Sequence, residues 1–92
     1  MEDATLTKIE SEVRDEMQLS PSIPSDMVKT FIREGEYTLN ETVEFLEIDF
    51  DTDLISRVLL KNYVRYAIFG DLTTFFKEYK GDLYATQIRY IQ

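Results

Sequence analysis

The sequence predicts an all-α protein: a single small helical domain over residues 1–92, with three main helices, one of them long, and a short C-terminal helix. Two observations favour this class. Apolar residues recur at intervals of three and four along most of the chain, as they do on one face of a helix. No segment shows sustained alternation of apolar and polar residues with β-branched enrichment, which is typical of strands. A chain of this length suits one domain with a modest core.

The first predicted helix runs from about Asp3 to Leu19. Asp3 is the expected N-cap, since a carboxylate suits the positive end of the helix dipole. The segment SPSIPS, residues 20–25, should end the helix, because its two prolines remove backbone donors and disfavour helical geometry before them. The apolar stripe has spacings of three, four and four and consists of Leu6, Ile9, Val13 and Met17.

The second predicted helix begins near Ser25 or Asp26 and continues to about Phe45. Gly35 lies on its apolar stripe, where glycine costs about 1 kcal/mol relative to Ala. It therefore marks either a close approach of another helix or a break, and we expect a continuous helix. The segment EIDFDTD, residues 47–53, should be a loop in which Asp51 or Thr52 caps the next helix. The stripe consists of Val28, Phe31, Ile32, Leu39, Val43 and Leu46.

The third predicted helix runs from Thr52 to Tyr79 and would be about 40 Å long at 1.5 Å per residue. Gly70, followed by Asp71 as a possible cap, either kinks it or splits it in two. Gly81 is the expected C-terminal stop, and a short helix should follow from Asp82 to about Tyr90. The expected inward face consists of Ile55, Leu59, Asn62, Tyr66, Phe69, Thr73 and Phe76.

The predicted core joins the three helices. Part of the long third helix exceeds what a compact domain of this size needs, so we expect that part to pack on another molecule. The core residues should be Phe31, Ile32, Leu39, Ile55, Leu59, Tyr66 and Phe69, joined by Leu6, Ile9 and Val13 if the first helix docks.

The residue types exclude much chemistry. The chain has no His and no Cys, which excludes Ser–His–Asp triads, Cys nucleophiles and His/Cys zinc sites. The longest uncharged run, residues 17–25, is far shorter than the roughly 20 apolar residues of a membrane span, and the acidic segment MEDATLTKIE does not resemble a signal peptide. We expect no enzymatic activity, no cofactor, no metal and no membrane contact.

One acidic motif resembles the start of a calcium-binding loop. Asp49, Asp51 and Asp53 give the opening D-x-D-x-D. The glycine and the bidentate glutamate that such a loop requires are replaced by Leu54 and Leu60. The motif therefore favours a solvated loop whose carboxylates cap the third helix.

Charge divides the chain into two parts. Residues 1–53 hold 15 acidic and 4 basic residues, a net charge of −11, whereas residues 54–92 hold 3 acidic and 6 basic residues, a net charge of +3. Arg57, Lys61 and Arg65 repeat at intervals of four and form one positive stripe. This stripe is either a solvated face that pairs with acidic groups of the same chain or a contact with an acidic neighbouring subunit or partner. The candidate interface residues are Arg57, Lys61, Arg65, Phe75 and Tyr79.

The segment LLKNYVRYAIFGDLTTFFKEYKGDL, residues 59–83, resembles the small head–tail connector, or adaptor, proteins of tailed bacteriophages. Upstream, LTKIESEVRDEM and SDMVKTFIREGEYTLNETV look like the first two helices of that family. The chain departs from the family pattern at Gly35, where a stronger helix former is expected. The positions that carry the resemblance are Leu59, Leu60, Asn62, Tyr63, Arg65, Tyr66, Phe76 and Tyr79.

The resemblance implies a structural virion protein that forms a homo-oligomeric ring between portal and tail. Its partners would be further copies of itself, the portal protein and a tail-side completion protein, and DNA would pass through without sequence-specific binding. It would be made in the bacterial cytoplasm, from an infecting phage or a prophage, and reside at the head–tail junction of the virion. A net charge of −8 suits a pore along which DNA slides. The alternative is an acidic DNA mimic or a helical regulatory protein that binds a protein partner.

Overall fold

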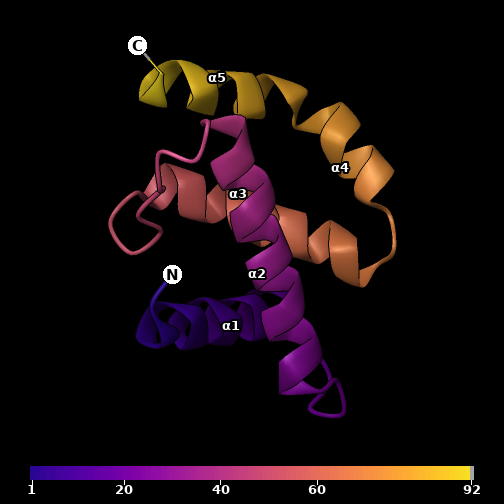
Figure 1. Ribbon diagram of the computed structural model, residues 1–92. Coiled ribbons are helices and arrows are strands. Elements are labelled where there is room, and N and C mark those ends of the chain that lie inside the picture. Colours follow the sequence, from indigo (N-terminus) through magenta and orange to yellow (C-terminus); the bar gives the residue numbers. More distant parts are fainter. Residues whose placement is uncertain (92) are drawn as a thin grey trace.

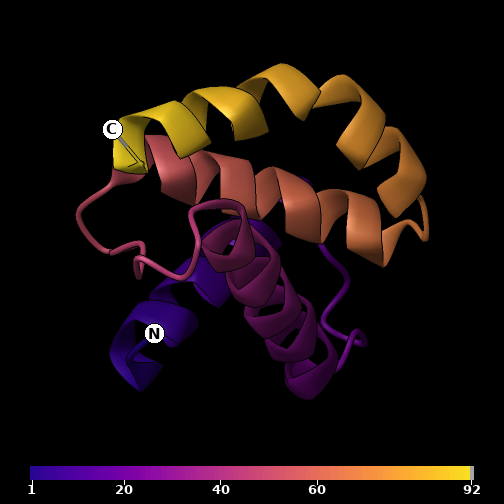
Figure 2. The same cartoon turned by 45° about the horizontal axis from the view of Figure 1, so that its top comes forward.

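The computed structural model describes residues 1–91 and confirms the all-α class: these residues form five helices and no strand. The helices are α1 (Asp3–Met17), α2 (Ser25–Thr42), α3 (Leu54–Ile68), α4 (Leu72–Glu78) and α5 (Lys80–Tyr90). In Figure 1, α2 crosses α3 and the end of α1, while α4 leads up to α5, which runs back along α3. Figure 2 shows α3 and α5 lying side by side, with α4 at the turn between them.

Helices α1 and α2 lie close to their expected positions. The proline-containing segment after Gln18 separates them, and Gln18 itself ends α1 in the left-handed conformation with φ 51°. The expected cap at Asp3 is wrong: Asp3 is already helical, and the residue before it, Glu2, makes no side-chain capping bond.

Gly35 explains why α2 and α3 approach so closely. A Cβ atom at this position would lie 2.6 Å from Leu60 Cδ1 and 2.7 Å from Tyr63 Cδ1. Ordinary carbon–carbon contacts are about 3.5–4.0 Å, so the side chains of α3 occupy the space that any other residue would need. The expectation of a continuous helix with a close neighbour is confirmed, because α2 runs through Gly35 unbroken.

The long third helix is divided, which corrects the expected 40 Å element. Gly70 has φ 71°, a conformation that glycine adopts without steric penalty, and the Asp71 carboxylate then accepts a hydrogen bond from the Thr74 N–H. A second break falls at Tyr79, between α4 and α5. Gly81 is therefore not a stop; it lies inside α5.

Asp53, rather than Asp51 or Thr52, caps α3. Its carboxylate accepts a hydrogen bond from the Ser56 N–H at 3.1 Å. The helix begins at Leu54, so Asp53 is the residue whose side chain can reach the free N–H groups of the first turn.

The core corrects the predicted face of α3. Six of the predicted core residues are buried, and Phe31 and Tyr66 are half-buried against them, but Ile55 is 68% exposed and Phe69 71% exposed. The buried face of α3 is centred instead on the residues that meet α1 and α2. The buried apolar residues are Leu6, Ile9, Val13, Val28, Ile32, Leu39, Val43, Ile48, Phe50, Leu59, Leu60, Tyr63, Val64, Ala67 and Phe75.

Candidate functional site

The three cations of the predicted stripe have different surroundings. The buried guanidinium of Arg57 donates hydrogen bonds to both carboxylate oxygens of Glu12 on α1, with Nε 3.1 Å from Oε1. Lys61 Nζ lies 3.1 Å from Glu12 Oε1 and 2.8 Å from Glu16 Oε2. The acidic face of α1 and the basic face of α3 therefore close on each other within one chain.

These ion pairs shift the ionisation of their members. Burial alone would raise the pKa of Glu12, but hydrogen bonds and charge attraction from Arg57 and Lys61 hold it below its ordinary value. Burial would lower the pKa of Lys61, and its bonds to Glu16 and Glu12 raise it instead. Both groups are thus held in their charged forms. Of the two alternatives that the sequence left open, the structure contains the pairing within the chain for Arg57 and Lys61.

Arg65 alone of the three remains on the surface. Its guanidinium lies 5.5 Å from the centre of the Tyr66 ring, and no carboxylate among residues 1–91 forms an ion pair with it. Of the predicted interface cations, Arg65 is the one with a charge free to meet another molecule.

Phe75 is not a surface residue, which corrects its place among the candidate interface residues. It is fully buried, and its ring centroid lies 5.3 Å from that of Tyr63 and 5.1 Å from that of Tyr79. The adjacent Phe76 is the more exposed of the pair, at 42%. The two rings do point in different directions, but α4 folds back on α3 so that Phe75 is the inner one. Tyr79 is half-buried and lies beside a surface groove.

That groove, the α3–α5 groove, is a site that the sequence interpretation missed. It has a volume of about 470 Å³ and runs between the two helices that Figure 2 shows side by side. Leu54, Ile55 and Val58 form its α3 wall, and each is more than half exposed. The sequence signal that could have indicated this groove is that apolar residues occupy both faces of α3. The lining residues are Leu54, Ile55, Val58, Leu59, Asn62, Tyr79, Asp82, Ala85, Thr86 and Arg89.

A polar cluster around Asp53 closes one end of the α3–α5 groove. The Asp53 carboxylate accepts hydrogen bonds from the Ser56 hydroxyl at 2.7 Å, from the Tyr90 hydroxyl and from Arg89 Nη1 at 3.3 Å. Burial alone would raise the pKa of Asp53, but the bonds from Tyr90 and Ser56 hold it at about 2. The cluster ties the last turn of α5 to the first turn of α3.

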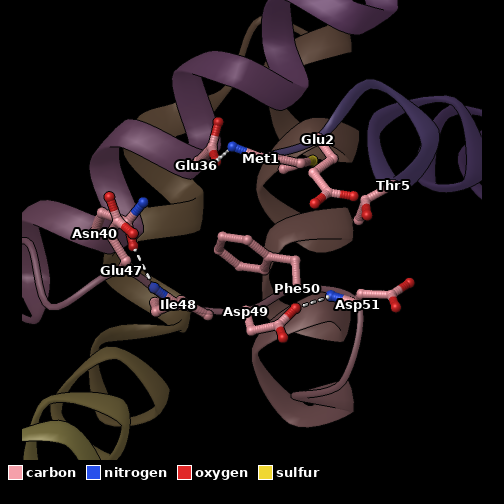
Figure 3. A pocket seen from close by; sticks show the side chains of 10 residues that line it. All are labelled: Met1, Glu2, Thr5, Glu36, Asn40, Glu47, Ile48, Asp49, Phe50 and Asp51. Carbon is pink, nitrogen blue, oxygen red and sulfur yellow. Dashed lines mark hydrogen bonds and ion pairs between the residues drawn. The ribbon is translucent and has the colours of Figure 1, made fainter.

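A second hollow, of about 650 Å³, lies between the N-terminus, α2 and the loop before α3, and Figure 3 shows its lining. The terminal amine pairs with Glu36 at 2.7 Å, and the Ile48 N–H donates to Asn40 Oδ1 at 2.8 Å. These bonds hold the loop against α2 around the buried ring of Phe50. The hollow is therefore a product of how the loop is fastened.

The acidic residues of this loop do not converge. Asp49 accepts a hydrogen bond from the Asp51 N–H, Asp51 pairs with Lys8, and Asp53 caps α3. Within residues 1–91 there is no group of three or more His, Cys, Asp or Glu side chains arranged to hold a metal ion. The helices of that same part of the chain include none with the length and apolarity to cross a membrane.

No protein-family model matches this chain, and no curated protein or solved structure is significantly similar to it.

Proposed function

We propose that this chain is a non-catalytic structural protein of tailed bacteriophages: a head–tail connector whose copies form a ring between portal and tail, through which DNA passes. Two lines of reasoning support the proposal. One is the resemblance of residues 59–83 to the connector family. The other is the exposed apolar wall of the α3–α5 groove, which is the observation that carries it.

The groove favours a protein partner. Leu54, Ile55 and Val58 are 62%, 68% and 53% exposed, and they stand together on one side of α3. Contiguous apolar surface of this kind marks interaction sites more often than single exposed residues do. The α3–α5 groove is a surface to which a protein partner could bind, and it supports the proposal in that way.

The DNA-mimic alternative has less support. Seven of the fifteen carboxylates in residues 1–53 are in ion pairs within the chain, among them Glu12 and Glu16 on α1. A DNA mimic needs its carboxylates presented as an ordered, unpaired array to a basic groove. The paired α1 face cannot serve in that way.

The test is co-purification from phage-producing cells. A tagged copy of the chain, expressed in a lysogen during induction, should recover the portal protein as a main partner. Recovery of a basic DNA-binding protein in its place would favour the mimic and contradict the connector role.

A further inference from the structure

The α3–α5 groove has one charged end whose charge is not neutralised within the chain. Arg89, at the other end, donates to Asp53 Oδ2 at 3.3 Å and to Ser56 Oγ at 3.2 Å, so its guanidinium is already paired. Asp82 also lines the groove, and its carboxylate forms no ion pair within residues 1–91. The charge that the groove presents to another molecule is therefore negative.

Asp82 and Asn62 stand together at the end of the groove away from Arg89. The last turn of α5, with Arg89, is tied to the first turn of α3, whereas the rings of Tyr79 and Tyr66, at the opposite ends of the two helices, have centroids 6.0 Å apart. Asp82 and Asn62 each lie about one turn from one of these tyrosines, and both line the groove. They therefore share one end of it.

The polar groups of this end can accept hydrogen bonds. The Asn62 side-chain amide donates to the backbone carbonyl one turn earlier at 3.1 Å, which leaves its Oδ1 to accept. The Thr86 hydroxyl is already bonded to the Asp82 carbonyl at 2.9 Å. The cations Arg65 and Lys80 lie close to this end in the sequence but are not among the lining residues of the groove. A carboxylate beside an amide oxygen matches an ammonium or guanidinium group, which carries donors only.

Between its two polar ends the groove is mainly aliphatic. Its α3 wall consists of the exposed residues Leu54, Ile55 and Val58, and Leu59 is buried at its base. From Leu54 to Asn62 the groove extends over eight residues of α3, about 12 Å at 1.5 Å per residue. Three apolar side chains at positions i, i+4 and i+7 of a helix span about 10 Å. The groove therefore has the length of the apolar stripe of a short amphipathic helix.

The surroundings of the groove favour a helix over other peptide conformations. An extended peptide binds by adding a strand to an exposed sheet edge, and residues 1–91 contain no strand. Proline-rich segments dock in grooves lined by aromatic rings, whereas Tyr79 is the one aromatic residue in the described lining of this groove. The groove between two helices that lie side by side (Figure 2) instead suits the side chains of a third helix.

We infer that the α3–α5 groove receives an amphipathic helix of another protein, with aliphatic side chains at successive turns and a lysine or arginine that meets Asp82 and Asn62. The inference rests on the proposed function, since it specifies the chemistry of the partner that the same groove would bind. Apolar burial supplies the affinity, and the ion pair with Asp82 sets the direction in which the helix lies. The net charge of −8 draws such a basic segment toward the chain.

The probe is a designed helical peptide. It has about 18 residues, because shorter isolated helices are marginally stable in water. Its alanine-rich sequence carries three leucines at positions i, i+4 and i+7 and a lysine one turn beyond each end of this stripe. A second peptide has glutamate in place of both lysines. Each peptide is titrated to about 1 mM into the isotope-labelled chain, and shifts of the amide NMR signals give the affinity and the place of binding.

Two variants test the two parts of the site, each with a matched control. Ile55→Glu places a charge in the aliphatic wall and should weaken binding of the lysine peptide by at least about tenfold. Its control is Tyr84→Glu, because Tyr84 of α5 is 64% exposed against 68% for Ile55 but does not line this groove. Asp82→Asn should weaken binding of the lysine peptide about two- to fivefold, but not that of the glutamate peptide. Its control is Asp26→Asn, which removes the same charge from the first turn of α2.

The wild type should bind the lysine peptide more tightly than the glutamate peptide, with signal shifts centred on the α3 and α5 residues that line the groove. All four substituted positions are exposed, so that the variants should keep the wild-type circular dichroism spectrum. Three results overturn the inference: no shift up to the highest concentration, shifts centred outside the groove, or equal effects of Asp82→Asn and Asp26→Asn. Self-association of the wild type in sedimentation velocity that Ile55→Glu abolishes would assign the groove to a second copy and overturn it as well.

Portal co-purification separates failure of this inference from failure of the proposed function. Binding of the lysine peptide in the groove of a chain that never recovers the portal protein keeps the inferred partner chemistry and removes the connector role. Recovery of the portal protein by a chain that binds neither peptide does the reverse.

Discussion

Replacement of Gly35 by alanine tests the packing that positions every surface described above. In an exposed helix, this change stabilises a protein by about 1 kcal/mol, because alanine is the stronger helix former. Here the new Cβ would lie 2.6 Å from Leu60 Cδ1 and 2.7 Å from Tyr63 Cδ1, about 1 Å closer than an ordinary carbon–carbon contact. The neighbours must move or α2 and α3 must separate.

Neither neighbour has room to move. Leu60 is fully buried, and the Tyr63 ring is held edge-on against Phe75 and Phe76, at centroid distances of 5.3 and 6.3 Å. Overpacking of such a site costs about 1–3 kcal/mol, and an overlap of this size belongs in the upper half of that range. After the gain in helix propensity, Gly35→Ala should lower the free energy of unfolding by about 1–2 kcal/mol.

Thermal unfolding followed by circular dichroism measures this difference. A loss of 1–2 kcal/mol corresponds to a fall in melting temperature of about 5–15 °C for a domain of this size. Gly81→Ala is the matched control: a Cβ there meets nothing within 4 Å, so that variant should gain up to about 1 kcal/mol. If Gly35→Ala raised the melting temperature as Gly81→Ala does, the close approach of α2 and α3 would be refuted.

Three further predictions concern the core and its ion pairs. Phe75→Ala should cost about 3–5 kcal/mol and Phe76→Ala markedly less, since Phe75 is fully buried and Phe76 is 42% exposed; equal losses in urea unfolding would contradict the assignment of the inner ring. Glu12→Gln should destabilise the fold by about 1–3 kcal/mol because it leaves the buried Arg57 without its carboxylate. Glu16→Gln is the control: it removes a largely exposed partner of Lys61 and should change stability by less than about 1 kcal/mol. In the folded protein Asp53 has a pKa of about 2 against an ordinary value of 3.8, so its bonds contribute about 2 kcal/mol to stability at pH values above about 4, and this contribution is lost as the pH falls from about 4 to about 2. Asp53→Asn should flatten that part of the stability–pH profile. An unchanged profile would show that the cluster with Tyr90 and Arg89 is absent.

Local signals in the sequence predicted much of the backbone. The apolar spacings located α1 and α2, and Gly35 on the apolar stripe left two alternatives, a close helix approach or a break, of which the structure contains the close approach. Gly70 and Asp71 marked the place where the predicted long helix could kink or divide, because glycine tolerates a positive φ and aspartate accepts bonds from free N–H groups; the structure divides the helix there. These features depend on a few neighbouring residues.

The orientation of α3 was not predictable in the same way. Apolar residues occupy both of its sides, so that periodicity gave two acceptable inward faces, and contact with α1 and α2 decided between them. The turn at Tyr79 carries no glycine or proline and arises because α5 folds back along α3. The packing of α4 on α3 buries Phe75, and the course of α5 along α3 forms the α3–α5 groove; neither result is encoded in local spacing.

The ion-pair partners of the basic stripe also depend on tertiary structure and could not be predicted from local sequence. The spacing of Arg57, Lys61 and Arg65 placed them on one face correctly, but it could not show that Glu12 and Glu16 of α1 lie opposite the first two. Two of the three cations of the stripe thus fasten α3 to α1. A contact with another molecule is left to Arg65.

The most direct test of the connector proposal is the protein content of the mature particle. Quantitative mass spectrometry of purified phage from cells that carry this gene measures the copies of the chain relative to the portal protein. A connector should be present in several copies for each portal ring and should remain after removal of loosely bound proteins with high salt. Particles that contain the portal protein but lack this chain would contradict the proposal.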